Sequence, residues 1–137
     1  VTKDFGTLNR YEVAQTGEKI AIIGLGTFFE LAKEAAKLLK EEAGINATVI
    51  NPYYITGLDE ALLTKLKQNH DTVITLEDGI LDGGFGEKIA RFYGANNMKV
   101  MNYGLKKEFL DRYDVDAVLK ENHLTAEQIV EDVLSIL

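Results

Sequence analysis

Short apolar runs rich in β-branched residues alternate along this chain with segments of helical periodicity. The runs are Lys19–Leu25, Ala47–Asn51, Thr72–Leu76 and Lys99–Tyr103. Short apolar runs bounded by glycine, proline or polar residues are typical of buried strands. Strands that alternate with helices form right-handed βαβ units and a mainly parallel sheet with helices on both faces. The pattern therefore predicts a three-layer α/β/α fold around a sheet of roughly five strands.

The segments between these runs contain recognisable helix ends. Thr27 is placed to cap a helix that continues to about Leu39, and Gly44 stands where a helix C-terminus favours glycine. Thr125 and Gln128 have the spacing of a capping box. Further helices are expected from Asp59 to near His70, from about Glu87 to Tyr93, and from Phe109 to Asn122. The last helix is predicted to face the core with Ile129, Val133, Leu134 and Leu137.

Length and charge narrow the function classes. The chain has 137 residues and a net charge of −7, which suits one domain and argues against a nucleic-acid surface. The sequence has no cysteine and no apolar run of the ~20 residues that a membrane span needs. We therefore expect a cytoplasmic protein. Residues 1–16 are polar and weakly patterned, which predicts a linker from a preceding domain and a folded domain at 17–137.

Few residues are candidates for catalysis or metal binding. Ser135 is the only serine and lies inside an amphipathic segment, so neither a Ser–His nor a Cys–His arrangement can be assembled. His70 and His123 both fall at predicted helix ends and lack further metal ligands at supporting spacing. The sequence thus predicts structural roles for both histidines, with the helix dipole favouring positive charge on His70.

The segment Gly24–Phe29 begins like a dinucleotide-binding fingerprint. Phe29 replaces the third glycine, where close helix–strand packing needs a small residue, and the second strand ends at Asn51 without an acidic residue. We interpret the glycines as a tight turn between strand and helix.

The loop from Leu76 to Phe92 is the most unusual stretch, with four glycines and four carboxylates. It lacks the Gly-Lys-Ser/Thr ending of a phosphate loop, and Gly79-Ile80-Leu81 interrupts the oxygen ligands that calcium requires. Glu77 and Asp78 are adjacent on an extended chain, so their side chains point in opposite directions. The sequence therefore assigns no catalytic, cofactor-binding or metal-binding residue.

A structural role for this loop is the remaining interpretation. Its glycines allow close backbone approach or positive φ, and Phe85 is placed to plug a gap. The predicted interface or structural loop comprises Glu77, Asp78, Gly79, Gly83, Gly84, Phe85 and Gly86.

Several motifs, in the correct order, resemble the C-terminal domain of the transketolase superfamily. They are Gly17–Thr27, Glu34–Leu39, Val49–Pro52, Leu58–Leu63, Thr75–Gly79 and Gly83–Gly86. Within the superfamily, Asn102–Leu105 and Leu124–Ile129 are most similar to the end of 1-deoxy-D-xylulose-5-phosphate synthases. The chain departs from their pattern at Tyr53, Gly57 and Lys106-Lys107, and it lacks a later His-Gly.

The resemblance implies a parent enzyme that uses thiamine diphosphate and magnesium. Such an enzyme decarboxylates pyruvate and joins the two-carbon unit to glyceraldehyde 3-phosphate, in isoprenoid precursor synthesis. The cofactor-binding residues are then in preceding domains, and this domain supports a homodimer and borders the active site without being catalytic alone. Alternatives are the same domain of a transketolase or of a 2-oxoacid dehydrogenase beta subunit, a free-standing interaction domain, and a dinucleotide-binding enzyme.

Overall fold

A computed structural model describes residues 11–52, 58–80, 85–94, 98–105 and 125–136. Its strands form one five-stranded sheet in the order β1-β3-β2-β4-β5, in which only β1 is antiparallel to its neighbour. The strands are β1 (Glu12–Gln15), β2 (Lys19–Gly24), β3 (Thr48–Asn51), β4 (His70–Ile80) and β5 (Lys99–Leu105). The predicted mainly parallel sheet is confirmed.

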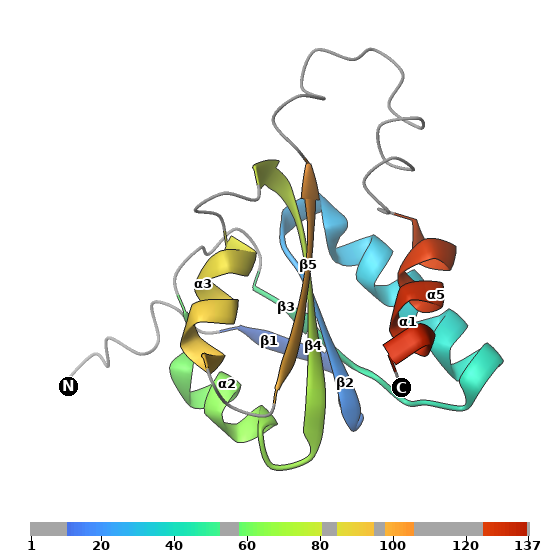
Figure 1. Cartoon of the computed structure of the whole chain (residues 1–137), viewed down its shortest axis with the longest axis horizontal. Helices are drawn as coiled ribbons and strands as arrows, with labels where there is room; N and C mark the ends of the chain where they lie inside the picture. Colours follow the sequence, from blue (N-terminus) through green and yellow to red (C-terminus); the bar gives the residue numbers. More distant parts are fainter. Residues whose placement is uncertain (1–10, 53–57, 81–84, 95–97, 106–124, 137) are drawn as a thin grey trace.

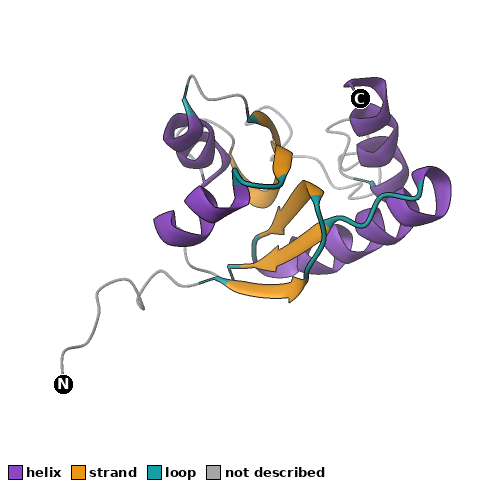
Figure 2. Ribbon diagram, turned by 90° about the horizontal axis from the view of Figure 1, so that it is seen from below, coloured by secondary structure: helices purple, strands orange, loops and turns teal. Residues whose placement is uncertain are grey.

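Helices cover both faces of this sheet (Figures 1 and 2). The helices α1 (Phe29–Ala43) and α5 (Ala126–Ile136) lie on one face, and α2 (Glu60–Leu66) and α3 (Phe85–Tyr93) lie on the other. A 3-10 turn, η2 (Gly26–Phe28), joins β2 to α1. The predicted three-layer α/β/α architecture is therefore confirmed.

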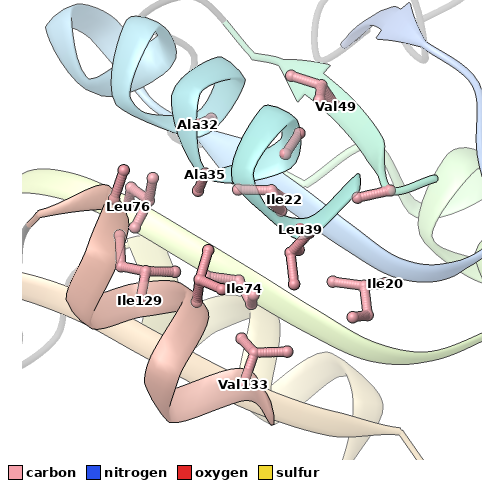
Figure 3. Packing of buried hydrophobic residues seen from close by; sticks show 14 of the residues in the cluster. Ile20, Ile22, Ala32, Ala35, Leu39, Val49, Ile74, Leu76, Ile129 and Val133 are labelled. Carbon is pink, nitrogen blue, oxygen red and sulfur yellow. The ribbon is translucent and has the colours of Figure 1, made fainter. Parts of the chain in front are cut away.

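The alternation of side chains along β2 divides the core into two parts. Ile20 and Ile22 point toward α1 and α5, whereas Ala21 and Ile23 point toward α2 and α3. All four side chains are fully buried. Figure 3 shows the first part, where Leu39 of α1 and Ile129 and Val133 of α5 pack over the strands. A sheet buried on both faces explains why its strands are continuous apolar runs rather than alternating ones.

The sequence failed to predict β1. This strand pairs with β3 inside the stretch 1–16 that the sequence assigns to a linker, so residues 12–15 belong to the sheet. Tyr11, directly before it, is buried against the core on the α2 and α3 face. All four residues of β1 are exposed, so no apolar pattern marks the strand in the sequence.

The two ends of α1 differ in how well the sequence predicts them. Gly44 adopts the left-handed conformation at φ 68°, and its N–H binds the Leu39 and Lys40 carbonyls, as expected of a C-terminal glycine. The prediction of a Thr27 cap is wrong, because the N-cap position of α1 is Phe28, without a side-chain cap. The 3-10 turn η2 takes up the intervening residues.

At the start of α2, Asp59 accepts a hydrogen bond from the Leu62 N–H at 3.2 Å, which confirms the predicted cap. The same carboxylate accepts the Tyr11 N–H at 3.0 Å and so links α2 to the segment before β1. The predicted end near His70 is wrong, because α2 ends at Leu66 and His70 begins β4.

The last helix begins as predicted, because the Thr125 hydroxyl accepts the Gln128 N–H at 3.2 Å. The Gln128 side chain in turn accepts the Thr125 hydroxyl, at 2.9 Å. Ile129 and Val133 are buried, but Leu134 is 37% exposed, so its predicted core position is wrong. The predicted helix at 109–122 and Leu137 lie outside the described residues.

Candidate functional site at the carboxyl edge of the sheet

The turn that follows β2, at Gly24, lies beside Leu76 of β4, where the predicted glycine-rich loop begins. Both positions are at the carboxyl ends of the parallel strands, which we call the carboxyl edge of the sheet. From β2 the chain crosses to β3 on one side, and β4 lies on the other side. This reversal of strand order is the place where open α/β sheets bind ligands, outside the carboxyl ends of the strands. Gly24 pairs with Leu76 there, and the Leu25 N–H donates to the Leu76 carbonyl at 2.9 Å.

Gly24 is required for this geometry by close packing. A Cβ at this position would lie 2.6 Å from the Phe28 carbonyl oxygen and 2.8 Å from the Phe29 Cα, and both are backbone atoms. Gly26 has φ 61°, in the left-handed region. The interpretation of these glycines as a tight strand-to-helix turn is therefore confirmed.

Glu77 joins β4 to the first turn of α3. The residue is 3% exposed, and its carboxylate accepts the Gly86 N–H at 2.5 Å. The first N–H groups of a helix have no partner within the helix, and negative charge is favourable at that end. Glu77, in the carboxyl half of β4, thus caps the first turn of α3.

Gly86 also packs tightly on the strands beneath it. A Cβ at Gly86 would lie 2.6 Å from the Thr75 hydroxyl oxygen and 2.7 Å from atoms of the Asn102 side chain. The Thr75 hydroxyl donates to Asn102 Oδ1 at 2.7 Å, which joins the carboxyl halves of β4 and β5. The Glu77 cap and this side-chain pair together fix where α3 begins.

The structure describes only some of the other residues of the predicted loop. Asp78 and Gly79 belong to β4, which continues to Ile80, four residues beyond the predicted strand end at Leu76. The pairing of β4 with β5 is irregular between Leu76 and Ile80. Phe85 is the first residue of α3. Gly83 and Gly84 lie outside the described residues.

The two predicted structural histidines have different outcomes. His70 is 8% exposed and lies at the opposite edge, between Thr48 Oγ1 at 2.7 Å and the Leu66 carbonyl at 3.1 Å. Burial lowers its pKa, partly opposed by the Leu66 carbonyl and by the charges of Asp71 and Glu18. Burial thus favours the neutral side chain, opposite to the direction expected from the helix dipole. His123 lies outside the described residues.

Three buried tyrosines show how strongly the interior disfavours charge. Burial raises the pKa of Tyr11, Tyr93 and Tyr103 well above the usual value. Tyr93 donates to the Leu63 carbonyl at 2.8 Å, and Tyr103 donates to Asp132 at 2.8 Å. The Tyr93 hydroxyl thus links α3 to α2, and the Tyr103 hydroxyl links β5 to α5. Both hydroxyls remain protonated.

The described part of the chain contains no group of three acidic or histidine side chains able to hold a metal ion. Its described helices are also too short or too polar to span a bilayer. Among the described residues at the carboxyl ends of the strands, Thr75 is bonded to Asn102 and Glu77 to the Gly86 N–H.

The sequence profile of the family "Transketolase, C-terminal domain" matches residues 9–129. The chain therefore belongs to the family of transketolase C-terminal domains.

Curated relatives are named 1-deoxy-D-xylulose-5-phosphate synthase. The protein of Symbiobacterium thermophilum is 37% identical over 126 residues, which are 90% of this chain and 19% of the relative. That of Rippkaea orientalis is 34% identical over 131 residues, 94% of this chain and 20% of the relative. The chain thus spans about a fifth of the length of these relatives.

Among solved structures, a split gene transketolase described as an inactive beta4 tetramer is similar, with a TM-score of 0.81 and 28% identity. The match covers 98% of this chain and 43% of that one. A 2-oxoglutarate:ferredoxin oxidoreductase from Magnetococcus marinus shares the fold, with a TM-score of 0.56 and 20% identity over 92% of this chain and 19% of that one.

Proposed function

We propose that this chain is the C-terminal domain of a 1-deoxy-D-xylulose-5-phosphate synthase. The observation that carries the proposal is the similarity of about nine-tenths of the chain to synthases at 32–37% identity. The parent enzyme converts pyruvate and glyceraldehyde 3-phosphate, with loss of carbon dioxide, in isoprenoid precursor synthesis. It works in the cytoplasm as a homodimer.

The parent uses thiamine diphosphate and magnesium, and preceding domains hold both. The described residues of this chain offer no cluster of metal ligands. Its buried carboxylate, Glu77, is bonded to the Gly86 N–H. We expect the domain to contribute assembly and the border of the active site, and the isolated chain to be inactive.

The test uses the complete parent polypeptide with thiamine diphosphate, magnesium and pyruvate. Carbon dioxide release is followed with and without glyceraldehyde 3-phosphate. We expect release that the aldehyde strongly stimulates, together with deoxyxylulose phosphate as the product. Without any release from pyruvate, the synthase assignment fails.

The second candidate is the same domain of a transketolase, which the TM-score of 0.81 to the split gene transketolase favours. Transfer of a two-carbon unit between sugar phosphates, without carbon dioxide release, would identify it. A 2-oxoacid dehydrogenase beta subunit would instead release carbon dioxide from its oxoacid without stimulation by the aldehyde.

We also propose that the loop between Glu77 and Gly86 contacts a neighbouring domain or the second subunit. Support comes from the Glu77–Gly86 hydrogen bond, which fixes both ends of the loop at the carboxyl edge. Gly84→Val in the parent is expected to weaken the dimer, measured by sedimentation, while correctly assembled molecules keep their turnover. Gly44→Ala is the control, because a Cβ at Gly44 meets no atom within 4 Å and only the left-handed φ of 68° carries a cost. Unchanged dimer stability in Gly84→Val would refute this role.

A further inference from the structure

A groove lies beside the amino ends of β2 and β3, which we call the amino edge of the sheet. Its volume is about 640 Å³. One side of the groove is formed by the second half of α1, and the other by Gln15 and Thr16 before β2 and by Asn46 before β3. Small-molecule sites in proteins have volumes of about 300–1,000 Å³, so the groove is large enough for such a ligand.

The backbone around this groove is held in place by hydrogen bonds. The Gln15 side-chain N–H donates to the Ala47 carbonyl at 2.9 Å, and the Glu18 N–H donates to the Asn46 carbonyl at 2.8 Å. On the α1 side, Ala36 is 3% exposed and packs into the core beneath the groove. The groove therefore follows from the packing of α1 against the sheet and does not depend on the rotamer of one side chain.

Positive charge gathers in this groove, although the chain as a whole is acidic. Lys33, Lys37 and Lys40 line it, together with one acidic residue, Glu41, whereas the net charge of the chain is −7. A spacing of four and then three residues places the three lysines along one side of α1. They extend over about 10 Å of the helix axis. Their ammonium groups can therefore act together on one ligand.

Two of these lysines have no partner among the described residues. Lys33 forms an ion pair with Glu30 at 3.2 Å and lies 5.3 Å from the centre of the Phe29 ring. Lys37 and Lys40 are exposed and form no ion pair with any residue that the structure describes. Their charge is therefore available to an anion from solution.

Two features oppose an anion here and restrict the kind of ligand. Glu41 repels it, and the C-terminus of α1 carries a partial negative charge. Lysine binds phosphate as a point charge, and Thr16 and Asn46 add a hydroxyl and an amide that can donate to phosphate oxygens. Two adjacent phosphate groups place more negative charge near these lysines than one phosphate does, and so overcome the repulsion more readily.

We propose that this lysine groove, formed by α1 and the segments before β2 and β3, binds a small molecule that carries two adjacent phosphate groups. Lys37 and Lys40 are its main charge partners. The proposal does not depend on the reaction assigned to the parent enzyme, because it rests on the charges and packing of this chain alone.

The test titrates the 137-residue chain with inorganic diphosphate by calorimetry, at pH 7.5 and about 0.15 M salt, so that weak surface attraction is screened. We expect one diphosphate to bind per chain, about tenfold or more tightly than inorganic phosphate. Amide chemical shifts should change most at Lys37, Lys40 and Asn46. Equal affinity for the two anions, or no saturation with diphosphate, would overturn the proposal.

Three double variants separate the lysine groove from the general charge of the chain. Lys37→Gln with Lys40→Gln should weaken diphosphate binding about tenfold or more. Lys65→Gln with Lys67→Gln removes the same charge from exposed positions at the end of α2, and should change the affinity less than about twofold. Lys37→Arg with Lys40→Arg keeps the charge and should retain binding. Equal weakening by the two glutamine pairs would indicate non-specific attraction and overturn the proposal.

Discussion

The strand β4 carries a buried polar side chain at its amino end and another near its carboxyl end, and the two hold the chain in different ways. Burial favours the neutral form of His70, which reaches Gly17 indirectly, through the Thr48 hydroxyl. Glu77 is a carboxylate and binds the Gly86 N–H directly. His70 is thereby linked to the turn before β2, and Glu77 to the first turn of α3. The comparison shows that one strand can fix neighbouring segments at both of its ends, through a neutral side-chain relay at one end and a direct carboxylate cap at the other.

The largest loss of stability should come from adding a methyl group at Gly17 or at Gly86, where neighbouring atoms leave no space for a Cβ. A Cβ at Gly17 would lie 2.1 Å from the Asn46 carbonyl oxygen, a backbone atom that cannot move by changing rotamer. At Gly86 the nearest atoms belong to side chains, at 2.6 to 2.7 Å. We expect Gly17→Ala to lower the free energy of unfolding by about 3 kcal/mol or more and Gly86→Ala by about 2 kcal/mol. Urea denaturation measures both.

Gly44→Ala is the matched control for these substitutions. Gly44 has φ 68° but open space around it, so only the cost of a left-handed alanine, about 1 kcal/mol, should remain. A larger loss in Gly86→Ala than in Gly17→Ala would reverse the comparison and mark the carboxyl edge as the more rigid one.

The second prediction tests the cap that Glu77 provides for the first turn of α3. Glu77→Ala leaves the Gly86 N–H without its acceptor and opens a small cavity, so we expect a loss of about 2 kcal/mol in the free energy of unfolding. Glu77→Gln keeps an acceptor oxygen but not the charge, and should lose about 1 kcal/mol. If the two variants are equally stable, the cap does not act through this hydrogen bond.

The sequence predicts the fold well because the central strands and helices carry their own signals. The apolar runs of β2 to β5 and the caps at Asp59, Gly44 and Thr125 are local features, readable from neighbouring residues. The strand β1 has no such signal, because its four residues are exposed and it is held by pairing with a strand more than thirty residues away. Its position depends on tertiary contacts alone.

The candidate site was predicted only in outline. The glycines and carboxylates from Glu77 to Gly86 indicate a demanding loop, but the acceptor for the first turn of α3 comes from a strand nine residues earlier. His70 is recognisable as structural, yet its partner Thr48 lies 22 residues away. Spacing within one element predicts caps, whereas these bonds depend on which strands become neighbours in the sheet.

The third prediction concerns pH and the neutral relay. Unfolded histidine has a pKa of about 6.5, and burial lowers the pKa of folded His70. Below pH ~6.5 the unfolded chain therefore binds more protons than the folded chain, so stability falls with pH until the folded side chain is also protonated. A fall from pH 7.5 to 5.5 should therefore lower the free energy of unfolding more in the wild-type chain than in His70→Gln. An identical difference in both would assign the pH response to other groups.

The smallest effect is expected at Lys19, where the amino edge carries backbone strain. Lys19→Gly removes the Cβ that disfavours φ 73°, but glycine also gains freedom in the unfolded chain. The two effects nearly cancel, so we expect a gain of a few tenths of a kcal/mol and at most about 1 kcal/mol in thermal unfolding. Lys19→Ala is the control, because it removes the exposed side chain and keeps the strained backbone. A Lys19→Gly variant that is clearly less stable than Lys19→Ala would show that the backbone there carries no strain for glycine to relieve.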